Sequence, residues 1–128
     1  MIKTTIKIPV YNCKVMVLVD TFFNINKESK AICKKNKVKH NGSSDYACVI
    51  TTDDIHTYYI LFSKNHMGIK TITHEVTHLG ATILNDRDID TDGDSEAFAY
   101  LNGFLAEEIE KIMEDNNLRL ITWKELVN

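Results

Sequence analysis

Two histidines and a glutamate within five residues form the part of the chain best suited to chemistry. His74, Glu75 and His78 stand in the order H-E-x-x-H. On an α-helix, positions four apart differ by only about 40° around the axis, so both imidazoles can bind one metal ion. Glu75 lies about 100° from His74, where its carboxylate can reach a water molecule on the metal without itself being a natural ligand. The spacing therefore predicts a metal site with a carboxylate beside it.

Chance is the alternative explanation of this pattern. A chain with five His and eight Glu among 128 residues contains H-E-x-x-H by chance in roughly one case in a hundred. The neighbouring residues favour a helix, because apolar side chains recur at helical spacing and no proline interrupts them. We therefore expect a metal-binding helix whose buried stripe consists of Ile72, Val76, Leu79 and Ile83.

A catalytic zinc site needs a third protein ligand and one open position. Glu96 is the candidate, because Asp94 or Ser95 can cap a new helix whose first turn carries this carboxylate. The alternative is that Glu96 only favours the positive end of a helix. On the ligand count, the sequence predicts a metal site formed by His74, His78 and Glu96.

The motif and the downstream glutamate together resemble the gluzincin metallopeptidases. A closer resemblance, specific over about residues 71–104, is to small metallopeptidases encoded by phages. Those proteins also tend to carry an Ile-Pro-x-Tyr segment near the start. The residues that carry this resemblance are Thr73–His78, Ile83–Arg87, Glu96–Phe104 and Ile8–Tyr11.

The resemblance implies a cofactor and an activity. Zn²⁺ would be held by His74, His78 and Glu96, and Glu75 would be the general base in hydrolysis of a peptide (amide) bond by a metal-activated water. The partner would be a peptide or protein substrate, and the resemblance does not imply which one.

The missing oxyanion stabiliser keeps a second function open. Full-size gluzincins supply a His or Tyr from a later domain, and this chain offers only Tyr100, His56 and His66 as substitutes. The alternative is a metal-binding interaction protein of phage origin with little or no catalytic activity.

Composition and cysteine usage indicate one cytoplasmic domain. The 128 residues are 44% hydrophobic, which predicts a single domain over 1–128. The sequence shows neither a membrane span nor a signal peptide, so we expect no membrane partner and a location in the cytoplasm, that of a host cell if the protein is phage-encoded. Cys13, Cys33 and Cys48 predict reduced thiols. Cys13 and Cys48 border apolar runs and should be buried.

Charge is distributed unevenly along the chain. Residues 1–64 carry ten Lys and five acidic residues (+5), whereas residues 65–128 carry five Lys or Arg and thirteen acidic residues (−8). Six of the lysines lie in Lys27–Lys39. They could contact phosphate, but no aromatic residue or arginine is interleaved among them. We expect a solvated helix face and regard a nucleic-acid partner as unlikely.

The acidic stretch Asp86–Asp94 begins like an EF-hand loop, with Asp88-x-Asp90-x-Asp92-Gly93. Position twelve is Ala99, where a bidentate Glu is needed. A solvated acidic loop is therefore favoured, and a calcium site remains the alternative.

The fold class predicted from these patterns is α+β. We expect a zincin-like minimal domain, with an antiparallel or mixed sheet of about four strands packed on the H-E-x-x-H helix and on the helix that follows it. The expected strands are residues 2–11, 15–19, 46–51 and 57–62. The first two suggest a hairpin or meander, in which the continuous apolar run at 15–19 is typical of a central strand covered on both faces, and the last two form a β-hairpin.

Two further helices are expected. A helix near 27–37, capped by Asn26 or the preceding turn, should bury Ala31 and Ile32, with Cys33 as a further candidate. A later helix at 95–115 should bury Ala97, Leu101, Phe104, Leu105, Ile109 and Ile112. The remaining expected elements are a turn at 41–45 and a packed tail at 118–127.

Overall fold

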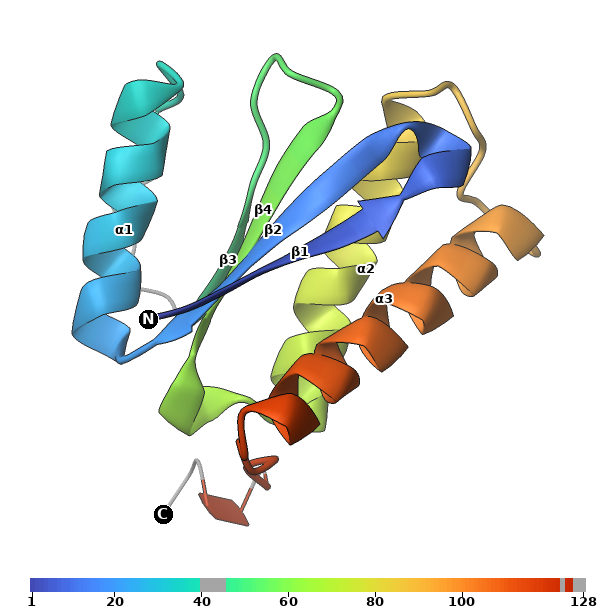
Figure 1. Cartoon of the computed structure of the whole chain (residues 1–128). Coiled ribbons are helices and arrows are strands. Elements are labelled where there is room, and N and C mark those ends of the chain that lie inside the picture. Colours follow the sequence, from blue (N-terminus) through green and yellow to red (C-terminus); the bar gives the residue numbers. More distant parts are fainter. Residues whose placement is uncertain (40–45, 123, 126–128) are drawn as a thin grey trace. The chain divides into compact units, whose positions relative to one another are not determined.

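The computed structural model describes residues 1–39, 46–122, 124 and 125. It shows an α+β protein with a four-stranded mixed sheet and three α-helices (Figure 1), which confirms the predicted fold class. Contacts between residues in space divide the chain into two compact units, Met1–Met67 and Gly68–Asn128. That the chain is one domain stays a prediction.

The first unit contains the sheet, with strand order β1-β2-β4-β3. β1 pairs with β2, and β3 with β4, in antiparallel fashion as predicted, whereas the central strands β2 and β4 are parallel. β1 ends before Pro9, because proline has no N–H to donate, and Pro9 begins a short 3₁₀ turn. The strands are β1 (Ile2–Ile8), β2 (Cys13–Asp20), β3 (Ala47–Ile50) and β4 (Thr57–Ser63).

Helix α1 (Phe22–Lys35) begins five residues earlier than predicted. Thr21 is its N-cap, and the Thr21 hydroxyl accepts a hydrogen bond of 3.4 Å from the backbone N–H of Asn24. α1 lies along one face of the sheet (Figure 1). The predicted burial of Ala31 is wrong, because the buried stripe passes through Ile25, Ser29, Ile32 and Cys33 instead.

The central strands are buried on both faces. Leu18 and Leu61 pack in a cluster with the apolar side chains of α1. On the opposite face of the sheet, Val17 and Ile60 are fully buried. This pattern agrees with the continuous apolar run predicted for a central strand.

The second unit contains α2 (Ile69–Asn85) and α3 (Glu96–Asp115), which run side by side in opposite directions (Figure 1). At their contact, a Cβ added to Gly80 would overlap the side-chain amide oxygen of Asn102. A residue without a side chain therefore allows the two helices to approach each other closely. The α3 stripe matches the prediction at Leu101, Leu105, Ile109 and Ile112, but Phe104 is 38% exposed and its predicted burial is wrong.

In the segment after α3, Asn117 has the left-handed conformation, at φ 55°. The N–H of Leu118 then donates to the carbonyl of Met113 at 2.8 Å. Trp123 and residues 126 and 127 of the predicted tail lie outside the described residues, as does the predicted turn at 41–45. Within the part of the chain that the structure describes, no helix is both long and apolar enough to cross a membrane.

Candidate metal site on helix α2

The H-E-x-x-H motif lies within α2, as predicted. The expected apolar stripe is buried at all four of its positions. His74 and His78 are both exposed, on the opposite side of the helix. The fold therefore uses one face of α2 and leaves the histidine face open to a ligand.

The two imidazoles lie at a distance that suits a shared metal ion. Their Nε2 atoms are 3.2 Å apart, and the rings are inclined at 76° with centroids separated by 4.6 Å. Two histidine nitrogens bound to one tetrahedral zinc at 2.0–2.1 Å would be about 3.3 Å apart. A single hydrogen bond between neutral imidazoles also fits this distance. The nitrogen pair thus fits zinc without rearrangement of α2.

Two threonines bond to the backbone beside the histidines. The Thr77 hydroxyl donates to the carbonyl of Thr73 at 2.7 Å, and the Thr82 hydroxyl donates to the carbonyl of His78 at 2.9 Å. Such bonds to the carbonyl four residues earlier are a local alternative to bonding with water. Glu75 lies within the turn from Thr73 to Thr77 and is half-buried. Its carboxylate thus belongs to the edge of the exposed face.

Glu96 is the first residue of α3 and is exposed. The cap predicted for this helix is present, because the Ser95 hydroxyl accepts a 3.3 Å hydrogen bond from the N–H of Phe98. Among the described residues, no three His, Cys, Asp or Glu side chains gather into a group that could hold a metal ion. The structure thus brings His74 and His78 together without Glu96, whose role as third ligand stays a prediction.

The acidic loop bonds mainly to itself. The Asp90 carboxylate accepts from the N–H of Asp92 at 2.9 Å, and the Asp90 carbonyl accepts from the Ser95 hydroxyl at 2.8 Å. Gly93 has a φ of 61°, a conformation that favours glycine. These bonds fix the approach to α3 and leave the aspartates of the loop exposed.

A hollow of about 760 Å³ adjoins the motif helix. His74 forms part of its wall, together with the start of α2 and the segment that follows α3. Its volume falls within the range of ligand pockets. The sequence predicted a packed tail but could not show that this tail would form a wall beside His74. The other lining residues are Gly68, Ile69, Lys70, Thr73, Leu120, Ile121 and Thr122.

Of the three candidate oxyanion stabilisers, only Tyr100 belongs to the same unit as the motif, and it is 76% exposed on α3. His56 lies in the other unit, where its Nδ1 is 2.8 Å from the carbonyl oxygen of Asn12. The ring of His66 stacks on Tyr46 with centroids 3.7 Å apart. Both histidines thus have partners in their own unit.

The three free cysteines are not part of this site. Cys13 is buried as predicted, whereas Cys48 is only half-buried. Burial raises the pKa of the Cys33 thiol, so this side chain is less reactive than an exposed cysteine.

Comparison of the chain with known protein families found no match, and comparisons with curated proteins and with solved structures found none either. The resemblance to gluzincins therefore depends on the residues of the motif and its context.

Proposed function

We propose that the protein is a zinc-dependent hydrolase of peptide (amide) bonds. The observation that supports this proposal is the 3.2 Å separation of the His74 and His78 Nε2 atoms on an exposed helix face. Imidazole nitrogens at this spacing are a donor pair that zinc prefers. Exposure matters as well, because a catalytic site must admit its substrate.

His74 and His78 would hold the metal, and Glu96 is the proposed third ligand. When bound, zinc would supply a Lewis acid that polarises a carbonyl and lowers the pKa of water. The Glu75 carboxylate would accept a proton from the attacking water and deliver it to the leaving amine.

The hollow beside His74 supports the substrate part of the proposal. Ile69 and Leu120, both exposed, line it together with Ile121. Such a wall would bind an apolar side chain of a peptide and so position a neighbouring amide bond near His74.

A second candidate is a metal-binding protein without catalytic activity. This alternative is favoured by the absence, among the residues placed in the structure, of a third ligand close to the histidines. A two-ligand site can recruit the remaining ligands from a partner protein. In that case binding of the partner would complete the metal site.

The test is cleavage of a generic peptide library by the zinc-loaded protein. We expect hydrolysis by the wild type, with zinc binding retained and hydrolysis lost in Glu75→Gln. Asn85→Ala, a substitution at an exposed position of the same helix outside the motif and the hollow, is the control and should cleave like the wild type. Stoichiometric zinc binding without cleavage by the wild type would contradict the hydrolase and favour the second candidate.

A further inference from the structure

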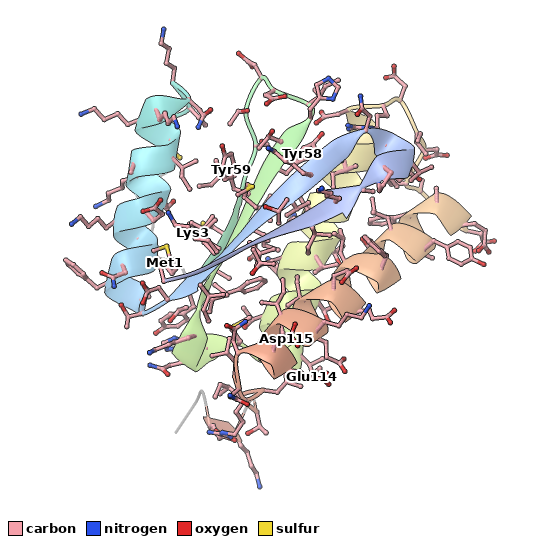
Figure 2. The ribbon with its side chains drawn as sticks, in the orientation of Figure 1. Met1, Lys3, Tyr58, Tyr59, Glu114 and Asp115 are labelled. Carbon is pink, nitrogen blue, oxygen red and sulfur yellow. The ribbon has the colours of Figure 1, made fainter. Side chains whose placement is uncertain are left out.

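The exposed face of α1 carries a narrow stripe of one aromatic and three basic side chains. Because α1 begins at Phe22, Phe23 lies one turn before Lys27 on the same face. The stripe continues through Lys30 and Lys34. Spacings of four, three and four residues place these four side chains within about 60° of arc. Figure 2 shows nitrogen-tipped side chains projecting from α1 away from the sheet.

Folding does not account for this stripe. Phe23 is 74% exposed, and the three lysines are exposed as well. The opposite face of α1 is fixed on the sheet through Ile25 and Ile32, which are buried in the core cluster. An exposed aromatic ring among cations thus contributes little to the core, and it lies on a helix held in place by its other face.

The positive charge of the stripe is not neutralised. Within the described parts of the chain, none of its three lysines forms an ion pair. Glu28 is the one acidic residue in the sequence of α1, and it lies about 100° from Lys27, outside the stripe. Residues 1–64 carry a net charge of +5. The face is therefore suited to a ligand with several negative charges.

We propose that this stripe binds single-stranded nucleic acid. Lys27, Lys30 and Lys34 extend over about 10 Å of the helix axis, so that each ammonium group can contact a different phosphate. Phe23 stacks on an unpaired base at the end of this row. A positively charged track combined with an aromatic platform is the arrangement by which proteins bind single strands without sequence preference.

Two other polyanions fit less well. A helix that binds to a membrane surface inserts its apolar face, but the apolar face of α1 is already buried against the sheet. A duplex would contact the lysines through its phosphates but offers Phe23 no unpaired base. The exposed ring therefore favours a single strand over both.

The test is fluorescence anisotropy of a labelled oligothymidine of about 20 nucleotides, titrated with the full-length protein at several salt concentrations. Removal of the three charges in Lys27→Gln/Lys30→Gln/Lys34→Gln should weaken binding at least tenfold and lower the slope of log K against log salt by about 2. Phe23→Ala should weaken binding at least fivefold with the slope unchanged, and Phe23→Tyr should retain binding.

The matched control is Lys3→Gln/Lys7→Gln/Lys14→Gln, which removes the same charge from exposed positions on β1 and β2. Circular dichroism checks that each variant is folded. The same titration is repeated with a duplex of the same length. Three results would overturn the proposal: an equal loss of affinity in the control triple variant, no effect of Phe23→Ala, or equal affinity of the protein for the duplex and for the single strand. Binding to phosphatidylserine vesicles without binding to the oligonucleotide would assign the stripe to membranes instead.

Discussion

Helices α1 and α2 are both amphipathic but present different chemistry on their exposed faces. Each buries one apolar stripe and leaves the opposite side exposed. On α1 that side carries lysines repeated every three or four residues. On α2 it carries His74 and His78, with their Nε2 atoms 3.2 Å apart.

The difference shows two ways in which a helix face can bind a ligand. The lysines of α1 act through the number of their charges, so the loss of one should reduce affinity only in part. The histidines of α2 act through a single distance, so the loss of either ring leaves one nitrogen for a metal that needs several. Binding by α2 should therefore depend much more strongly on each residue and on how the helix is held.

The largest effect on stability is expected where α3 contacts α2. Gly80→Leu should lower the free energy of unfolding by about 2 kcal/mol, because the new side chain would overlap Asn102 and approach Phe98. Urea unfolding monitored by circular dichroism measures this change.

Gly103→Ala is the matched control, because a Cβ at this helical position has no atom within 4 Å. It should stabilise the protein by roughly 0.5–1 kcal/mol through helix propensity. If Gly80→Leu were as stable as the wild type, the close contact between α2 and α3 would be wrong.

A smaller effect concerns the third ligand. Glu96→Gln should weaken zinc binding at least about tenfold and leave the fold intact, since Glu96 is exposed and a neutral amide is a poorer zinc ligand than a carboxylate. Competition with a chromophoric chelator measures the affinity.

Asp90→Asn and Asp92→Asn are the controls for Glu96→Gln and should barely change the affinity. A zinc site that is weakened by either control and unaffected by Glu96→Gln would assign the third ligand to the acidic loop.

The smallest effect concerns the start of α1, which positions Phe23. The Asp20 carboxylate accepts hydrogen bonds from the Thr21 N–H at 2.7 Å and from the Asn24 side chain at 3.2 Å. These two bonds hold the pKa of Asp20 below its ordinary value. Asp20→Asn should therefore destabilise the protein by about 1 kcal/mol at neutral pH.

The pH dependence of this difference follows from the sign of the shift. Because the pKa is lower in the folded state, the stabilisation is present above the unfolded pKa of about 3.9 and is lost as pH falls through the folded value. Urea unfolding of both proteins at neutral and acid pH should show the difference shrinking below about pH 4. A difference that stays constant or grows in acid would contradict this role of Asp20.

Much of the fold could be predicted from local patterns. The stripe through Val76 and Leu79 indicated α2, and the cap at Ser95 indicated the start of α3 to within one residue. Apolar runs and turn residues indicated both antiparallel strand pairs. These features depend on residues close together in the chain.

Features that depend on distant or subtle contacts were not predictable. The parallel pairing of β2 with β4 joins segments about forty residues apart. Phe104 lies one residue from buried Leu105, about 100° around the helix, so periodicity alone could not show that it is exposed. For α1, Asn26 was a possible cap, but Thr21 is the actual one, and this shift brought Phe23 onto the lysine stripe.

The most direct test of the metal site is a zinc titration of the wild type, His74→Ala, His78→Ala and the control His56→Ala, which removes an exposed histidine outside the motif. We predict one zinc per wild-type chain and an unchanged affinity in His56→Ala. In each motif variant the zinc affinity should be at least about a hundredfold weaker. The reason is that loss of a direct ligand should exceed the 10–100-fold cost of losing an outer-shell partner. Wild-type affinity in either motif variant would contradict the site.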